Sequence, residues 1–405
     1  MTVTANARPE SSIDLSDPVV NHDPFPYYEE LRSVGPVVWN PPSNAWLVTS
    51  FDVAKSVFAN PKDFAQDQEM YQEVHGVVTL PGVDNPRHNE LRSILGPLMS
   101  RSAAEGHAAL AQSVIDQNLN PVFEQLRAGE TVDVAALCRT ISTEFVVRIL
   151  GVPTEDCGQF VTWAEQMAGG FDLTMTPGLD NADAIRRAAA DGTRALSEYA
   201  ASALEDRRRS GVTTDMLGAL ATTPVPMTPE ERIGYVTMVI QGGQDTSATW
   251  AKNTTAALAE HPDQRKAVIE DKDLVRQTLD EVIRWNAPVT AEVRVVRNPG
   301  VQIGGVAVEQ GDHVIMLLGA AHRDPTRWDN PEKFDVRRPQ LGNLGFGFGV
   351  HSCLGVNFAR RLVTSLTETL LREIPHYKVA IPNTGFIYGR SYAVRGTSRL
   401  PLSLV

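Results

Sequence analysis

The amino-acid sequence predicts a mainly helical protein with a small β region. Helical patterning dominates residues 103–260, with breaks at short turns that contain glycine or proline. Strand patterns occur near both ends of the chain. Residues 36–49 read as a β-hairpin around Asn40-Pro-Pro-Ser-Asn44, and residues 294–315 form a β-rich patch with glycine turns. We therefore expect helices to form the bulk of the fold and a small sheet to form at its edge.

The N-terminal part is expected to begin with a flexible arm over residues 1–20, followed by one domain over residues 21–405. Asp23-Pro-Phe-Pro opens a short helix that continues to Arg32. After the hairpin, Ser50 is placed to cap a helix over residues 51–60.

A long central helix is predicted over residues 228–261. Thr228-Pro-Glu-Glu231 is a capping box with proline in the first turn. About 30 helical residues would span about 45 Å. Gly242-Gly243 lies in the middle, and each glycine costs about 1 kcal/mol relative to alanine, so another interaction must compensate. We expect Thr246 to donate a hydrogen bond to the Gly242 carbonyl and open the helix beside Asp245. The alternative is a close approach of another helix.

The composition is that of a folded globular protein. Of 405 residues, 42% are hydrophobic and 21% are charged. The net charge of −12 argues against binding to nucleic acid or to an anionic membrane surface. No apolar run approaches the roughly 20 residues of a membrane span, and no signal peptide is visible. Three separated cysteines form no disulfide framework or zinc motif. We expect a cytoplasmic protein.

Cys353 is the most informative residue, because of the run Phe346-Gly-Phe-Gly-Val-His-Ser-Cys-Leu-Gly355 and the helical stretch 356–373 that follows. Glycines allow positive φ and close approach of a bulky partner. Free backbone N–H groups and the following helix N-terminus would lower the pKa of the thiol and favour thiolate. A thiolate suits a soft or redox-active metal. The alternative is a buried free cysteine beside a glycine-rich loop.

The spacing Phe-x-x-Gly-x-His-x-Cys-x-Gly resembles the haem-ligand signature of the cytochrome P-450 family. Two further features occur in the family's order. Gly242-Gly-Gln-Asp-Thr246 is similar to the family's oxygen-activating Gly-x-Asp/Glu-Thr segment, with Asp245 and Thr246 in the matching positions. Glu281-Val-Ile-Arg284 is similar to its ExxR motif, although an isolated ExxR pair is usually surface decoration.

The resemblance implies the cytochrome P-450 fold, with the long central helix over a haem b (iron protoporphyrin IX) whose iron is bound by Cys353. Arg338, with Arg337 as the alternative, would complete a structural network with Glu281 and Arg284. The implied cofactor-binding residues are His88, Arg92, Arg294, Phe346, His351, Cys353 and Gly355. For the histidines and arginines in this set, which would meet the haem propionates, the alternative is a solvated surface cation.

The activity implied by the resemblance is that of a bacterial haem-thiolate monooxygenase. Such an enzyme inserts one oxygen atom from O2 into a substrate, by hydroxylation or O-demethylation. Asp245 and Thr246, with ordered water, would deliver protons. No flavin or iron–sulfur motif is visible, so the implied electron donors are a ferredoxin and its NAD(P)H ferredoxin reductase.

The substrate is expected to be a small hydrophobic or aromatic molecule. Residues 64–86 show little periodicity, and so long an irregular segment is usually functional or disordered. Residues 64–84 of this segment are expected to contact the substrate. The expected pocket residues are Tyr71, Val78, Phe171, Val239, Gly242 and Val289. Two departures from the family pattern stand near the site. Gly242 replaces a common alanine, and Ala359-Arg-Arg-Leu362 lacks a common glutamate.

Rival functions remain on the same fold. A peroxide-using relative would carry another group where Asp245 and Thr246 stand, and a nitric-oxide reductase would lack the acid. A non-catalytic haem-binding sensor or carrier would need neither proton relay nor electron partner.

A docking surface for the ferredoxin is expected on the cysteine side of the haem. The chain is acidic, yet arginines gather in two segments of that side: Arg87, Arg92, Arg101, Arg360 and Arg361. A basic patch would attract an acidic ferredoxin. The alternative is that these arginines serve propionates and local ion pairs.

Overall fold

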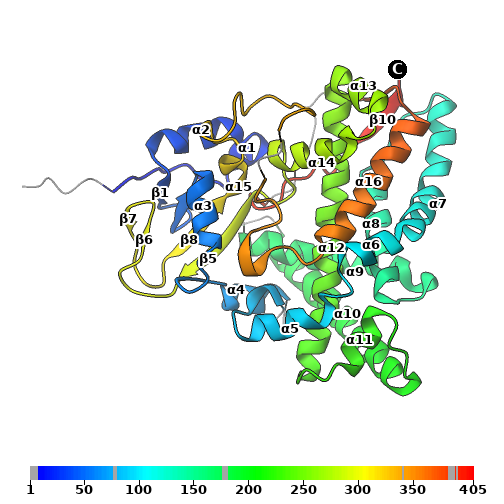
Figure 1. Cartoon of the computed structure of the whole chain (residues 1–405), viewed down its shortest axis with the longest axis horizontal. Coiled ribbons are helices and arrows are strands. Elements are labelled where there is room, and N and C mark those ends of the chain that lie inside the picture. Colours follow the sequence, from blue (N-terminus) through cyan, green and yellow to red (C-terminus); the bar gives the residue numbers. More distant parts are fainter. Residues whose placement is uncertain (1–7, 76–79, 176–180, 340–341, 382–387, 389–390) are drawn as a thin grey trace, which may run out of the picture.

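The computed structural model describes residues 8–75, 80–175, 181–339, 342–381, 388 and 391–405. The structure is mainly helical, and its small sheet lies at one side, as predicted (Figure 1). The blue N-terminal strands and the yellow strands near residue 300 lie together there (Figure 1). None of the described helices is both long enough and apolar enough to cross a lipid bilayer.

The main sheet has five strands in the order β1-β2-β8-β5-β3. The β1–β2 hairpin is antiparallel, which confirms the prediction for residues 36–49. β2 then pairs in parallel with β8, so strands about 270 residues apart are neighbours. The strands are β1 (Val37–Asn40), β2 (Ala45–Val48), β3 (Phe64–Ala65), β5 (Ala291–Val296) and β8 (His313–Leu317). Two smaller sheets hold β4 (Val132–Asp133), β10 (Pro401–Leu404) and β9 (Tyr377–Val379), and β6 (Gln302–Ile303) and β7 (Val306–Ala307).

Helices supply the rest of the regular structure. The first group is α1 (Pro18–His22), α2 (Phe25–Val34), α3 (Phe51–Phe58), α4 (Gln68–His75), α5 (Arg87–Leu95), α6 (Arg101–Gly106), α7 (Ala108–Arg127) and α8 (Ala135–Leu150). The second group is α9 (Cys157–Met175), α10 (Ala182–Ser210), α11 (Met216–Thr222), α12 (Pro229–Glu260), α13 (Pro262–Glu270), α14 (Leu274–Trp285), α15 (Leu318–Ala321) and α16 (Val356–Glu373).

Helix α12 is the predicted central helix, and it runs through the helical part of the molecule (Figure 1). The Thr228–Glu231 capping box is present, with both of its hydrogen bonds. From Ser247 to Leu258 every residue is buried. A helix buried on all sides can be apolar all round, and here the buried hydroxyls of Thr254 and Thr255 bond back to carbonyls four residues earlier.

Three local expectations differ from the structure. Residues 9–13 are not loose, because Trp39 of β1 exchanges backbone hydrogen bonds with Pro9 and Ser11. The irregular segment 64–86 contains α4 and a short 3-10 helix at Leu80–Gly82. Ser50 stands at the N-cap position of α3, but its side chain makes no capping hydrogen bond to the helix. The carboxylate of Asp324 accepts the Phe51 N–H at 3.0 Å.

Candidate active site

The loop that carries Cys353 is a tight turn in front of α16. Gly347 and Gly349 have φ values of 68° and 74°, a region that favours glycine, and an added Cβ at Gly349 would approach the Phe58 carbonyl oxygen to 3.0 Å. The Cys353 N–H donates to the Phe346 carbonyl at 2.8 Å and closes the loop. Cys353 is exposed, whereas Cys138 and Cys157 are buried. The alternative of a buried structural cysteine therefore does not describe this residue.

The expected lowering of the thiol pKa is wrong for the chain by itself. The thiol lies deep among protein atoms, although part of its surface is open, and this desolvation raises the pKa of Cys353. The backbone N–H of Gly355 acts in the opposite direction, but more weakly. A bound cation reverses this balance, because coordination to a metal deprotonates a thiol.

Phe346, at the start of the loop, anchors it to α12. Its ring packs edge-on against Trp250, with 5.3 Å between ring centroids. Trp250 is fully buried and donates its indole N–H to the Leu279 carbonyl of α14 at 3.2 Å. The cysteine loop is therefore fixed relative to both helices.

Glu281 of α14 lies at the centre of a buried ionic network. Arg284 donates to both carboxylate oxygens, at 2.7 and 2.8 Å. Arg338 donates to Oε1 at 3.1 Å, while Arg337 is exposed. The three side chains of the network are each at most 10% exposed. Of the two arginines left open by the sequence, the structure brings Arg338 to the glutamate.

Hydrogen bonds connect this network to the cysteine loop. Arg284 donates to the His322 carbonyl at 3.2 Å, and the His322 Nε2 accepts the Leu344 N–H at 2.8 Å. Burial lowers the pKa of His322 to about 3, so the ring stays neutral and can accept. The Leu344 carbonyl in turn accepts the Gly347 N–H at 2.8 Å. Glu281 thus supports the backbone on which Cys353 is carried.

The two glycines of α12 have different surroundings. An added Cβ at Gly243 would lie 2.7 Å from Val146 of α8, and the Ser142 hydroxyl donates to the Gly243 carbonyl at 3.0 Å. At Gly242 an added Cβ would meet none of the described atoms within 4 Å. A close helix approach therefore explains Gly243, while Gly242 borders open space.

Thr246 makes the expected hydrogen bond to the Gly242 carbonyl, at 2.7 Å. The helix continues without interruption, so the expected local opening is not seen. Asp245 pairs with Arg139 of α8 at 3.6 Å, and Arg139 also donates to Glu165 of α9 at 2.7 Å. The acid is part-exposed and is held by a neighbour on α8 that the sequence did not reveal.

His88 and His351 lie ring to ring, with centroids 4.2 Å apart. Both nitrogens of His88 lie near backbone carbonyls, at 3.1 Å from Val83 and 3.1 Å from Val350. His88 therefore braces the two loops here. His351 places Nε2 at 3.4 Å from Asp84, and its Nδ1 is buried without a described partner.

The two arginines expected near the propionates are placed differently from each other. The guanidinium of Arg92 on α5 makes no hydrogen bond or ion pair with any described residue, and Arg92 is partly buried. Arg294 is buried, lies over the Phe58 ring at 5.1 Å and is 3.5 Å from Glu292. The alternative of solvated surface cations therefore does not describe Arg294.

The expected pocket residues come from several elements. Tyr71 of α4 lies against Gly82, where an added Cβ would be 2.9 Å from the Tyr71 Cβ. Val239 of α12 is buried, and Val289 forms an isolated bridge with Val394. Val78 and the side chain of Phe171 lie outside the described residues.

Comparison with known proteins identifies the family. The model of the family described as Cytochrome P450 matches residues 172–384, which is more than half of the chain. The chain belongs to the cytochrome P450 family. Its sequence is 28% identical over 393 residues to cytochrome P450 monooxygenase PikC of Streptomyces venezuelae, covering 94% of this chain and 91% of PikC.

Two further similarities support the same family. This P450 is 26% identical over 409 residues to the vitamin D(3) 25-hydroxylase of Pseudonocardia autotrophica, with 96% of each chain covered. The crystal structure of CalO2 matches with a TM-score of 0.87 and 25% identity, over 97% of this chain and 99% of CalO2. The P450 fold and the activity of an oxygen-incorporating oxidoreductase follow from these relationships, as the sequence predicted.

The cofactor of the family is haem b, and the residues of this P450 fit it. The thiol of Cys353 is open to contact, and added Cβ atoms at Gly355 and Gly242 would meet none of the described atoms within 4 Å. The unpartnered Nδ1 of His351 and the guanidinium of Arg92 are the donors that anionic propionates require.

Some residues near the site were missed by sequence reasoning. Asp84, Arg139 and Glu292 all contact predicted site residues. Glu292 and Arg294 are two residues apart on one strand and therefore lie on the same face, so their contact could have been predicted from the sequence. The contacts of Asp84 and Arg139 could not be predicted in this way, because their partners are distant in the sequence.

Proposed function

We propose that this P450 monooxygenase hydroxylates or O-demethylates a small hydrophobic or aromatic substrate in the cytoplasm, with electrons from a ferredoxin and its NAD(P)H ferredoxin reductase. Bound haem would supply the one-electron and O2 chemistry, and Cys353 would be its thiolate ligand. The observation that carries the proposal is the exposed thiol on a braced loop, in a chain whose α12 presents Asp245 and Thr246.

The chain's own residues would hold the cofactor and move protons. Arg92, Arg294 and His351 would bind the propionates, and Phe346 and Gly355 would border the ring system. Asp245 would pass protons by way of ordered water, since its part-exposed carboxylate reaches toward Arg139 and solvent. Thr246 would hold that water beside the open face of Gly242.

The experiment that tests this function combines a spectrum with turnover. Reduced protein with carbon monoxide should absorb where thiolate-bound haem does. NADH should then be consumed in step with hydroxylated or demethylated product when ferredoxin and reductase are added. A carrier or sensor of the same fold would give the spectrum without turnover, and that result would overturn the proposal.

Substitutions at Thr246 and Asp245 test the proposed delivery of protons. Thr246→Ala should keep NADH and oxygen consumption but divert most of it to hydrogen peroxide, because the water beside Gly242 loses its anchor. Asp245→Asn should slow turnover by about 100-fold, since positioned acid–base groups contribute at least that factor. Product, peroxide and NADH are measured together.

Two control variants separate proton delivery from helix packing. Thr254→Ala removes the same kind of hydroxyl-to-carbonyl bond from α12 at a fully buried position. Glu165→Gln alters the other carboxylate bound by Arg139. Both should keep normal coupling. Full product yield per NADH in Thr246→Ala and Asp245→Asn would show that the pair only packs the helix.

The surface proposed for ferredoxin docking offers fewer unpaired arginines than the sequence indicated. Arg87 donates to Glu231, Arg360 to Asp280 and Arg361 to Glu105, so local ion pairs occupy three of the five arginines. Arg101, at the start of α6, is exposed and makes no side-chain bond to any residue of the described ranges. Arg101 is therefore the main candidate on this surface.

Charge reversal tests this docking surface. Arg101→Glu should slow reduction by the ferredoxin about tenfold at low salt and leave substrate affinity unchanged. Arg361→Glu should act in the same direction but less, because Glu105 already offsets its charge. The loss should shrink as the Debye length falls below about 10 Å. Arg194→Glu on α10 is the control. Reduction rates indifferent to Arg101→Glu and to salt would place docking elsewhere.

A further inference from the structure

We propose that a groove beside α4 binds the positively charged end of an amine-bearing substrate whose body is largely apolar. This inference rests on the proposed monooxygenase function, because it names the class of molecule that the reaction would take. The groove has a volume of about 1430 Å³ and is open to solvent. Cys353, Thr246 and Gly242 do not line it, so it is a recognition site separate from the thiol.

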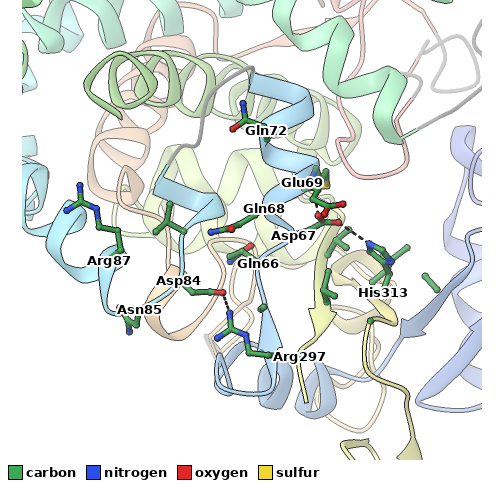
Figure 2. A pocket seen from close by; sticks show the side chains of 18 of the residues that line it. Gln66, Asp67, Gln68, Glu69, Gln72, Asp84, Asn85, Arg87, Arg297 and His313 are labelled. Atoms are coloured by element: carbon green, nitrogen blue, oxygen red, sulfur yellow. Dashed lines mark hydrogen bonds and ion pairs between the residues drawn. The ribbon is translucent and has the colours of Figure 1, made fainter. Parts of the chain in front are cut away.

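The groove has an apolar floor and a polar rim. Strands β2, β5 and β8 supply the floor, with Ala45, Val293, Val295 and Ile315. The rim comes from residues 66–72, residues 83–87 and the first turn of α12. Figure 2 shows the polar side chains of α4 and its preceding segment on one side of the groove and His313 close to Asp67. Such a surface fits an amphiphilic molecule better than a wholly apolar one.

Negative charge exceeds positive charge along the rim. Five carboxylates and two arginines line the groove. Each arginine already has a carboxylate partner, since Arg297 pairs with Asp84 and Arg87 with Glu231. Asp67, Glu69 and Glu230 remain without an arginine or lysine partner among the described residues. Figure 2 shows Asp67 and Glu69 close together.

Gln66 adds an independent sign of a missing donor. The residue lines the groove and is only 6% exposed, yet its Oε1 is buried and has no described hydrogen-bond partner. A buried acceptor without a donor costs free energy. The carboxylate of Asp67 already accepts the Met70 N–H at 3.0 Å and lies 2.9 Å from the His313 Nε2, whereas the carboxylate of Glu69 has no described partner. Together with Gln66, these two acidic residues form a set that a protonated or quaternary amine, with its polarised N–H or C–H groups, would complement.

The groove is joined to the cysteine loop through Asp84. One carboxylate oxygen of Asp84 binds Arg297 in the groove, and the other lies 3.4 Å from Nε2 of His351, two residues before Cys353. The same segment carries Gly82, which contacts Tyr71. A molecule with its cation at Asp67 and Glu69 therefore lies against the segment that borders the reaction site.

Binding of matched ten-carbon probes to the haem-loaded enzyme tests the proposal. Decyltrimethylammonium, decanol and decyl sulfate share one chain and differ in charge. The quaternary nitrogen has no lone pair, so it cannot coordinate iron. By calorimetry below micelle concentrations, the ammonium should bind about tenfold more tightly than decanol, and decyl sulfate most weakly. The preference should decrease with salt. Equal affinities for the ammonium and decanol would overturn the proposal.

Substitutions of the groove carboxylates test where the ammonium group of the probe binds. Glu69→Gln removes charge without removing any described contact, and Asp67→Asn keeps an acceptor for the Met70 N–H that caps α4. The double variant should lose about tenfold in affinity for the ammonium and nothing for decanol. Glu124→Gln, at an exposed position of α7, is the matched control. A double variant that binds the ammonium as the parent protein does would refute the groove as its site.

The measurements distinguish an error in the proposed binding groove from an error in the proposed monooxygenase function. The ferrous–carbonyl spectrum and product formation are recorded on the same preparations. Their loss with intact probe selectivity would overturn the proposed reaction alone. Normal turnover without charge selectivity would overturn the groove alone.

Discussion

Cys353→Ala is expected to abolish the ferrous–carbonyl absorption typical of thiolate-bound haem. Cys353 is the only cysteine of its loop, and the other two cysteines of the chain are buried elsewhere in the helical part. No other side chain on the loop could supply a thiolate to a bound haem iron. The measurement is the spectrum of reduced protein with carbon monoxide, together with the amount of haem per chain.

Cys157→Ala is the matched control, because it removes a thiol at the start of α9 and leaves the cysteine loop intact. Its spectrum should match that of the parent protein. A Cys353→Ala protein with an unchanged spectrum would contradict the assignment of the ligand and with it the proposed reaction.

Glu281→Ala is expected to yield little haem-loaded protein. The substitution leaves Arg284 and Arg338 buried without their carboxylate and also removes the acceptor of the Asp335 N–H at 3.0 Å. Removing one partner of a buried ion pair costs about 3–5 kcal/mol. This is a large part of the 5–15 kcal/mol that is typical of folded proteins, so the backbone support of the cysteine loop should fail.

Haem content and chemical denaturation measure this effect. Glu373→Ala is the control, because its carboxylate pairs with Arg127 at the surface, where such pairs contribute about 0–1 kcal/mol. Glu373→Ala should retain full haem loading. If Glu281→Ala were equally stable and fully loaded, the network would have no supporting role.

Features with short-range causes were predictable from the sequence. The Thr228–Glu231 capping box, the hairpin around residues 40–44 and the Thr246 bond to Gly242 each join residues at most a few positions apart. Glu281 and Arg284 meet because they are three residues apart on one helix. The choice of Arg338, with Arg337 as the alternative, depended on the family resemblance, since both lie in an irregular segment where no period assigns a face.

Features that depend on distant partners were not predictable. Arg361 and Glu105 are 256 residues apart in the sequence, yet they form an ion pair, which offsets part of the predicted basic patch. Arg139 approaches Asp245 only because α8 packs closely on α12. Whether the pKa of the Cys353 thiol is raised or lowered depends on how deeply protein atoms bury it. No sequence pattern gives the depth of burial. Helix α4 has only 8 residues, which is too short for hydrophobic periodicity to identify a helix securely.

Gly242 and Gly243 differ in whether a larger side chain can replace them. A Gly→Ala change inside a helix is worth about 1 kcal/mol in helix propensity, a gain that the natural chain forgoes at both positions. At position 243 the gain is unobtainable, because the new methyl group would force α8 and α12 apart. At position 242 the space is open, so larger side chains can be accommodated beside the Thr246 hydrogen bond while the helix pair stays intact. Directed evolution of new regioselectivity should therefore randomise position 242 and leave its neighbour fixed.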